Sequence, residues 1–216
     1  MEPLAYTTQH ARVLPEGREL TEANVEELFE AAGALRRGHF VLKSGRHSDR
    51  YLEKFAVLQY PSLTVEIGRR LAALLEERDP TLVVGPTTGG VLLAFETARQ
   101  LEASLDRTVR GVFAEPMERG TRGLRRGWPV ASGERVVLVD DILTTGASLD
   151  ETARAVRAAG AEPLAAAVIA DRSSGPVELG FPILSLGRIE IESWTAQECP
   201  ACARDEPLVK PGSSVS

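Results

Sequence analysis

Short apolar runs alternate with helix-length amphipathic stretches through the second half of the chain. Several consecutive apolar residues are typical of a strand that is buried on both faces. Strands are predicted over residues 82–84, 110–114, 135–139, 164–170 and 183–189, and helices up to residue 105 and over 148–159. Strands alternating with helices of ten or more residues predict right-handed crossovers and a mainly parallel sheet. The sequence therefore predicts an α/β fold that binds ligands beyond the carboxyl ends of its strands.

The first sixty residues follow a different pattern. Thr21 is a candidate cap for a helix with apolar residues spaced by three and four, and Gly38 is expected to end it. Residues 39–58 predict two short strands joined by a turn, and Ser62 is expected to cap a second helix with Val65 on its buried face. The predicted units are an irregular arm (1–20), a small segment (21–60), the α/β core (61–190) and a C-terminal segment with a frayed tail (191–216).

Composition places the chain among ordinary globular proteins. Of its 216 residues, 43% are hydrophobic and 26% are charged, which excludes disordered and fibrous classes. The longest apolar runs are far shorter than the ~20 residues that span a bilayer. The N-terminus has neither a basic nor an apolar region, so no signal peptide is predicted. With only two cysteines, the expectation is a soluble cytoplasmic protein without membrane association.

Positive charge is concentrated in two segments of an acidic chain. The net charge of −6 argues against general nucleic-acid affinity. Residues 36–54, however, hold six basic and two acidic side chains, and residues 116–127 hold four arginines and one acid. The two segments suggest a local anion site, although solvated surface charge explains them equally well.

Residues 136–148 combine a buried strand, two carboxylates and a turn of small residues. Asp140 and Asp141 follow the apolar run, and strand geometry points neighbouring side chains to opposite faces. The small residues after them would expose backbone N–H groups at a helix N-terminus, which suits a phosphate. Ser148 with Glu151 three residues later predicts a capping box for that helix. Since carboxylates accept hydrogen bonds from vicinal hydroxyls, this segment fits a ribose 5-phosphate group.

Two other interpretations of this segment are weighed against that one. An apolar strand ending in acids is also found in nucleoside triphosphatases, which need a partner G-x-x-x-x-G-K-[ST] loop. The only lysines are Lys43, Lys54 and Lys210, and none follows a glycine, so that interpretation fails. The remaining alternative is a buried strand whose terminal acids are merely solvated.

Residues 136–148 resemble the phosphoribosyl pyrophosphate signature of the type I phosphoribosyltransferases. Within that superfamily, residues 40–48 and Ala170-Asp171-Arg172 are similar to segments of the orotate phosphoribosyltransferases. Leu124-Arg125-Arg126-Gly127 and Cys199-Pro200-Ala201-Cys202 resemble one bacterial branch of that family. The resemblance covers roughly residues 20–212. It implies a twisted, mainly parallel sheet flanked by helices, with residues 21–60 forming a small N-terminal hood.

The resemblance also implies an activity, with a role for each matching residue. The activity is transfer of 5-phosphoribosyl from phosphoribosyl pyrophosphate to orotate with Mg²⁺, giving orotidine 5′-phosphate and pyrophosphate, as in pyrimidine (UMP) biosynthesis. Lys43, Thr144 and Arg172 would contact orotate, and residues 84–90 would face the pyrophosphate with an unusual backbone. Mg²⁺ would be held mainly by the substrate, with Asp141 as the candidate protein ligand. The implied catalytic residues are Asp140, Asp141, Lys43 and Arg119, and the implied phosphoribosyl pyrophosphate contacts are Lys43, Thr87, Thr88, Asp140, Asp141, Ile142, Leu143, Thr144, Thr145, Gly146, Ala147 and Ser148.

A mobile loop over residues 115–127 is the part where the sequence departs from the family pattern. In this family the loop usually closes over the partner's active site in a homodimer. Here it contains no lysine, and its candidate residues are Glu115, Arg119, Arg122, Arg125 and Arg126. Arginine supplies the charge but not the compact geometry of an ammonium group. Two alternatives therefore stay open: the same chemistry on another base, and a regulator that senses phosphoribosyl pyrophosphate and binds nucleic acid without catalysis.

Cys199 and Cys202 have the spacing of metal ligands, but one pair gives two ligands where structural zinc needs four. A dimer could bring two pairs together. Otherwise reduced thiols in a tight turn are expected. His39 is interpreted as a packing residue, and His47 as a turn residue or a pyrophosphate contact.

Overall fold

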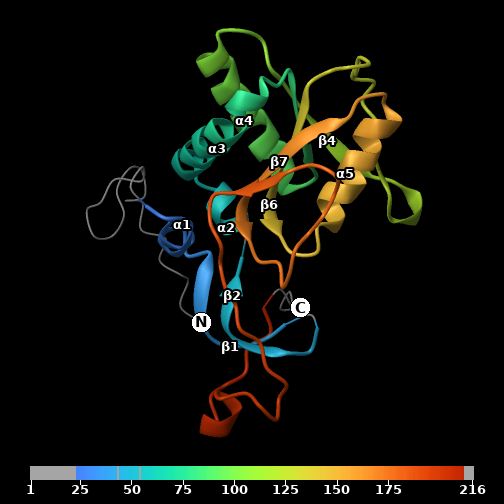
Figure 1. Ribbon diagram of the computed structural model, residues 1–216. Coiled ribbons are helices and arrows are strands. Elements are labelled where there is room, and N and C mark those ends of the chain that lie inside the picture. Colours follow the sequence, from blue (N-terminus) through green and yellow to red (C-terminus); the bar gives the residue numbers. More distant parts are fainter. Residues whose placement is uncertain (1–22, 43, 54, 212–216) are drawn as a thin grey trace.

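A computed structural model describes residues 23–42, 44–53 and 55–211, which form a large and a small sheet with their helices (Figure 1). The large sheet has six strands in the order β5-β4-β3-β6-β7-β8, and the small sheet pairs β1 with β2. The strands are β1 (Leu35–Val41), β2 (His47–Leu52), β3 (Leu82–Pro86), β4 (Arg110–Pro116), β5 (Arg122–Gly123), β6 (Val136–Leu143), β7 (Pro163–Asp171) and β8 (Ile183–Ser185). The α-helices are α1 (Val25–Ala31), α2 (Phe55–Leu58), α3 (Pro61–Leu75), α4 (Gly89–Leu105) and α5 (Ala147–Ala158), and the 3₁₀ helices are η2 (Glu76–Arg78), η3 (Glu118–Gly120) and η4 (Cys202–Arg204).

The large sheet is parallel except at one edge. β3 pairs in parallel with β4 and β6, and β6–β7 and β7–β8 are also parallel. The antiparallel partner of β4 is the two-residue strand β5, which the sequence did not predict. The prediction of a mainly parallel, helix-flanked sheet is confirmed, and every predicted strand overlaps an observed one.

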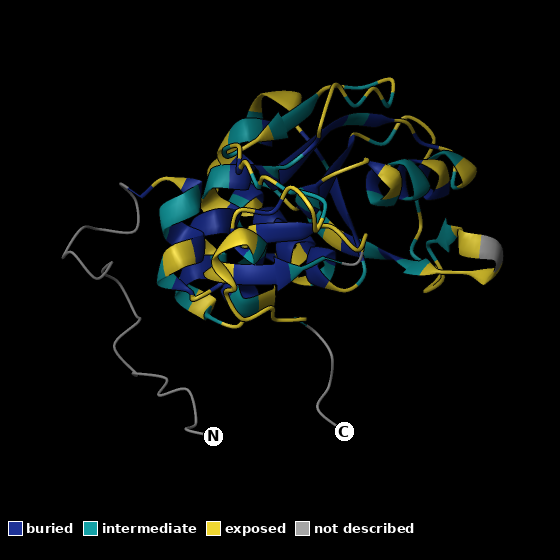
Figure 2. Cartoon of the chain, turned by 90° about the horizontal axis from the view of Figure 1, so that it is seen from below, coloured by how far each residue is buried: buried dark blue, intermediate teal, exposed yellow. Residues whose placement is uncertain are grey.

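Both faces of this sheet are buried, because the side chains of each central strand alternate between two cores. Val137 and Val139 of β6 belong to the core shared with α3 and α4, whereas Val136 and Leu138 belong to the core shared with α5. In Figure 2 the sheet is largely dark blue, and the helices around it are exposed on their outer sides. Because both faces are covered, the central strands are continuous apolar runs in the sequence, and this allowed them to be predicted.

The first helix is shorter than predicted. Asn24 caps α1, and its side chain and that of Glu27 form a capping box. The expected helix end at Gly38 is wrong: Ala32 is the C-cap and Gly33 has a φ of 63°, a conformation that favours glycine. The proposed cap Thr21 lies outside the described residues, as do the arm 1–20 and residues 212–216 of the tail.

The α3 helix begins differently from the prediction. Its N-cap is Tyr60, which makes no side-chain capping bond, and Pro61 occupies the first turn, where its missing N–H costs nothing. The cap predicted at Ser62 is therefore wrong. Val65, expected on the buried face, is 42% exposed.

The two predicted N-terminal strands are present as β1 and β2, and the C-terminal segment pairs with both. Phe40 of β1 bridges Val209 in parallel, and His47 of β2 bridges Trp194 in antiparallel orientation. Figure 1 shows this segment, drawn in red, running across the small sheet below the large one. The hood is thus built from both ends of the chain. The division into four units stays a prediction. In the part of the chain that the structure describes, no helix is long and apolar enough to cross a membrane.

Candidate active site

Asp140 and Asp141 lie near the carboxyl end of β6 and point in opposite directions. The strand continues to Leu143, so the two acids are part of the strand rather than following it. Asp140 is 5% exposed and Asp141 is 2% exposed. Asp140 faces α5 and Asp141 faces the N-terminus of α4, as shown by their neighbours Ser148 and Gly89. The predicted divergence of the two carboxylates is confirmed.

Ser148 hydrogen-bonds to Asp140 instead of capping α5. Ser148 Oγ donates to Asp140 Oδ2 at 2.5 Å, and the Asp141 backbone N–H donates to Asp140 Oδ1 at 2.8 Å. The N-cap of α5 is Gly146, with a φ of 79° and no side-chain capping bond. The predicted capping box of Ser148 and Glu151 is therefore wrong, and Glu151 instead forms a 3.2 Å ion pair with Arg122. Tertiary partners have drawn both side chains away from the helix terminus.

The turn from β6 into α5 leaves a polar surface open. Thr144, Thr145 and Ala147 are exposed, and Thr145 Oγ1 accepts a 3.4 Å hydrogen bond from the Ala147 N–H. Gly146 is required here, because a Cβ would lie 2.5 Å from Val177 Cγ1 in addition to adopting positive φ. With the positive end of α5 beneath it, this turn has the charge and donors that suit a phosphate. Ile142 is half-buried and Leu143 is buried, so any contact they make with a ligand would be through the backbone.

The turn after β3 lies directly against Asp141. A Cβ at Gly89 would be 2.7 Å from Asp141 Oδ2, so only a residue without a side chain fits between the turn and the carboxylate. The peptide bond between Thr87 and Thr88 is cis. The unusual backbone expected over residues 84–90 is therefore present.

Arg122 connects this turn to the α5 helix. Its Nη1 lies 3.3 Å from Thr87 O, from Thr87 Oγ1 and from Ala114 O, and its Nε pairs with Glu151. These contacts with residues of the same chain fix the Arg122 side chain beside the turn after β3.

The remaining loop residues lie on a hairpin that projects from the sheet (Figures 1 and 2). Arg126 forms two hydrogen bonds with Glu115, at 2.9 and 2.6 Å, and Arg125 is exposed. The Arg119 backbone is part of η3, and its side chain lies outside the described part of the chain. The predicted loop is thus a short hairpin, and Arg122 anchors its inner end.

Arg172 follows β7 beside the end of β6. Its N–H donates to Leu143 O at 2.8 Å, which aligns it with the turn that begins at Thr144. Burial lowers the pKa of the half-buried guanidinium, and among the described residues no carboxylate forms an ion pair with it. An anionic ligand would compensate this desolvated charge. Lys43, predicted beside it, lies outside the described residues.

The described candidates converge on one edge of the sheet. Asp140, Asp141, the turn 144–148 and the turn 87–89 come from neighbouring strands, so their proximity follows from the parallel topology. Sequence reasoning missed three contacts: Ser148 with Asp140, Gly89 with Asp141, and Arg122 with Thr87. Only the glycine pair Gly89-Gly90 after an apolar run gave a signal for any of them, since glycine permits close backbone approach.

Comparisons with known proteins define the class to which this fold and site belong. Residues 56–201 match the family model of the phosphoribosyl transferase domain, so the chain is a member of that domain family. It is 40% identical over 194 residues to the orotate phosphoribosyltransferase of Caldanaerobacter subterraneus subsp. tengcongensis, covering 90% of this chain and 98% of that protein. The protein of the same name from Caldicellulosiruptor bescii is 43% identical over 187 residues, covering 87% of this chain and 95% of that protein. The chain therefore belongs to the orotate phosphoribosyltransferase family.

A solved structure agrees with this assignment at the level of the fold. The crystal structure of orotate phosphoribosyltransferase from Aeropyrum pernix aligns with a TM-score of 0.58 at 23% identity, covering 76% of this chain and 93% of that one. The expected type I phosphoribosyltransferase-like fold is confirmed.

Proposed function

We propose that this protein transfers the 5-phosphoribosyl group from phosphoribosyl pyrophosphate to orotate, releasing pyrophosphate and forming orotidine 5′-phosphate. The observation that carries the proposal is the placement of two buried carboxylates beside an open turn of small residues at one helix N-terminus. Family membership supports the choice of orotate over other bases. The half-buried Arg172 beside that turn supports an anionic base.

Asp140 and Asp141 would accept hydrogen bonds from the ribose hydroxyls, and the turn 144–148 would receive the 5-phosphate. Thr87 and Thr88 would face the pyrophosphate, and Lys43, Thr144 and Arg172 would contact orotate. The bond from the anomeric carbon to pyrophosphate breaks as a bond to a ring nitrogen of orotate forms, with oxocarbenium character on the sugar, and that nitrogen releases its proton to solvent. Positioning and charge stabilisation supply the rate of such a transfer. Arg119 and Arg125, on the projecting hairpin, would add positive charge when the loop closes and water is excluded.

The residues around the site fit the Mg²⁺ that the family implies. Asp141 offers hard carboxylate oxygens, the ligand type that this ion prefers, although its Oδ1 already accepts from the Ile142 N–H at 2.7 Å. The ion would therefore be bound mainly through substrate oxygens, with Asp141 as the candidate protein ligand, and it would neutralise charge on the leaving pyrophosphate.

We also propose a homodimer in the cytoplasm. The hairpin of residues 115–127 projects from the sheet, as expected for a loop that reaches a partner's site (Figure 1). Leu92 and Phe95, one turn apart on α4, are 49% and 66% exposed, and apolar side chains of this size are typical of an interface.

The test follows orotate absorbance with phosphoribosyl pyrophosphate and Mg²⁺, with parallel samples holding uracil, hypoxanthine or adenine. The double variant Asp140→Asn/Asp141→Asn serves as the blank. Loss of orotate alone, abolished in the blank, is the expected result. It would show that the loop over residues 115–127 supports catalysis without a lysine. Turnover of another base would overturn the assignment of orotate. Binding of phosphoribosyl pyrophosphate without turnover of any base would favour the regulator instead.

A further inference from the structure

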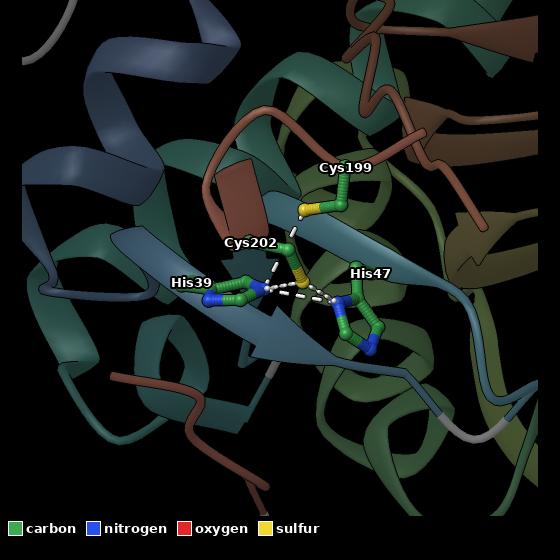
Figure 3. Close-up of side chains that lie close together, drawn as sticks. All are labelled: His39, His47, Cys199 and Cys202. Atoms are coloured by element: carbon green, nitrogen blue, oxygen red, sulfur yellow. Dashed lines mark hydrogen bonds between the residues drawn. The ribbon is translucent and has the colours of Figure 1, made fainter. Parts of the chain in front are cut away.

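Two histidines and two cysteines from opposite ends of the chain meet between the small sheet and the C-terminal segment (Figure 3). His39 belongs to β1 and His47 to β2, whereas Cys199 and Cys202 lie on the C-terminal segment. One ligand atom from each residue lies within 4.8 Å of the other three. His39, His47 and Cys199 are buried, and Cys202 is half-buried, so the cluster is largely shielded from water.

The distances between these atoms match a shared centre. His39 Nε2 lies 3.5 Å from each sulfur, at Cys199 and Cys202, and 2.9 Å from His47 Nδ1. His47 Nδ1 lies 3.2 Å from Cys202 Sγ. Zinc bonds of ~2.0–2.1 Å to nitrogen and ~2.3 Å to sulfur in a tetrahedron place nitrogens ~3.3 Å apart, and nitrogen and sulfur ~3.6 Å apart. Four of the six pairs thus lie close to these values, and all six lie within 4.8 Å, so shifts of up to about 1 Å would let the four atoms surround one ion.

The hydrogen bonding of His39 leaves its inner nitrogen free to coordinate. His39 Nδ1 is 2.9 Å from Glu206 O, and a carbonyl oxygen only accepts, so Nδ1 carries the proton. In the neutral ring, Nε2 then presents its lone pair to His47 and the two sulfurs. An imidazole N–H donated to a backbone carbonyl is the usual arrangement behind a metal-ligating histidine.

We propose that His39, His47, Cys199 and Cys202 bind one structural Zn²⁺ ion. Two sulfurs and two imidazoles in a tetrahedral set favour zinc over the hard cations, and four protein ligands leave no position for substrate. Cys199 and Cys202 alone provide only two ligands, and the fold brings two further candidate ligands, His39 and His47, from more than 150 positions earlier. The packing role expected for His39 agrees with its burial, and the ligand role proposed here adds to it.

The ion would hold the C-terminal segment against the hood. On either side of the cluster, Val209 N–H donates to His39 O at 2.8 Å, and Trp194 N–H donates to His47 O at 2.8 Å. The ion would thus fix β1 and β2, the two strands of the small sheet. If the proposed function holds, zinc would position the hood over the site without contacting substrate.

The first test is elemental analysis of untagged protein, dialysed against Zn²⁺ and then desalted. We expect about one zinc per chain, and about a tenfold loss in each of Cys199→Ser, Cys202→Ser and His47→Asn. Glu198→Gln, next to the cluster but exposed, is the matched control and should keep its zinc. Zinc content is measured without turnover. A failure of the zinc proposal can therefore be distinguished from a failure of the proposed function.

A second test needs no variant and so avoids misfolding. Co²⁺-loaded wild-type protein should show the visible bands of tetrahedral cobalt and a thiolate charge-transfer band. Removal of the zinc with a chelator should lower the melting temperature by about 10 °C. The proposal is overturned if the wild type retains less than a tenth of an equivalent of zinc, or if the cysteine variants retain as much as Glu198→Gln. A Cys199–Cys202 disulfide in freshly purified protein, with no metal bound, would also overturn it.

Discussion

Ser148 Oγ donates a hydrogen bond to Asp140 Oδ2 over 2.5 Å, which fixes a buried carboxylate from the first turn of the following helix. The second oxygen of Asp140 accepts from the Asp141 N–H. The carboxylate is therefore oriented from both sides before any ligand arrives. Such preorganisation matters where a rate depends on positioning.

Ser148→Ala should raise KM for phosphoribosyl pyrophosphate and lower kcat/KM by about 10–100-fold. The loss corresponds to a hydrogen bond to a charged group, about 1.5–3 kcal/mol. Steady-state kinetics with varied phosphoribosyl pyrophosphate measures it. Ser104→Ala, on the far part of α4, removes an exposed hydroxyl whose one hydrogen bond within the described residues is to Leu101 O, and it should change nothing. Equal kinetics in both variants would rule out a role for the Ser148 bond.

Gly89→Ala should abolish most activity while leaving the fold intact. The new Cβ would meet Asp141 Oδ2 at 2.7 Å and displace the carboxylate or the turn that carries Thr87 and Thr88. A misplacement of about 1 Å costs on the order of 100-fold in rate. Gly175→Ala is the control, because a Cβ there meets nothing within 4 Å. The assay is kcat/KM beside circular dichroism, and a fully active Gly89→Ala variant would contradict the close approach described here.

Arg122→Lys should lower kcat/KM by about tenfold although the charge is kept. Its planar fork reaches Thr87, Ala114 and Glu151 at once, and an ammonium group does not reproduce that geometry. Glu151→Gln removes the ion pair but leaves the contact with Thr87, so it should have a smaller effect. Arg107→Lys, which alters the surface pair with Asp79, serves as the control. If Glu151→Gln lowers kcat/KM as much as Arg122→Lys, the ion pair rather than the turn contact would be responsible.

Arg172→Gln should raise KM for orotate by about 10–100-fold and leave KM for phosphoribosyl pyrophosphate nearly unchanged. The half-buried guanidinium, with its pKa lowered by burial, gains from an anion that balances its charge. Kinetics with each substrate varied in turn separates the two constants. Arg157→Gln, on the outer part of α5, is the charge-matched control. A uniform rise in both constants would place Arg172 outside the base subsite.

The strands and the site edge could be predicted because their causes are local. Val136 to Val139 form an unbroken apolar run since both faces of β6 are covered, and parallel topology then brings the strand ends together. Helix starts were less predictable. Ser148 and Glu151 have the residue types of a capping box, but Asp140 and Arg122 outcompete the helix terminus for them. Local sequence patterns do not predict interactions with partners that come close only in the folded chain.

The metal-ligand cluster shows the same limit over a greater distance. The spacing of Cys199 and Cys202 indicated possible metal ligands, whereas no pattern in the sequence linked His39 and His47 to the C-terminal segment. Their meeting depends on the bridges Phe40–Val209 and His47–Trp194, which join the small sheet to isolated residues 169 and 147 positions later in the sequence. No period or motif in the sequence encodes that pairing.

Glu66 should contribute stability that is lost on acidification. It accepts hydrogen bonds from Arg69 at 2.9 and 2.8 Å and from Arg70 at 2.7 Å. Burial alone would raise the pKa of Glu66, but the bonds from the two arginines outweigh it, and the pKa lies below its usual range. The carboxylate therefore stabilises the fold above the unfolded pKa of about 4.3, and this contribution disappears as pH falls through the lower folded pKa.

Glu66→Gln should accordingly unfold more easily at pH 7, by about 1–3 kcal/mol, because two arginines lose a charged acceptor. The difference from wild type should shrink between pH 5 and pH 3, as the wild-type carboxyl becomes neutral like the amide. Urea unfolding followed by the fluorescence of Trp128 and Trp194 at each pH gives the free energies. Glu77→Gln, on the exposed 3₁₀ turn after α3, is the control and should match wild type throughout. A difference that stays constant from pH 7 to pH 3 would show that Glu66 acts through packing rather than charge.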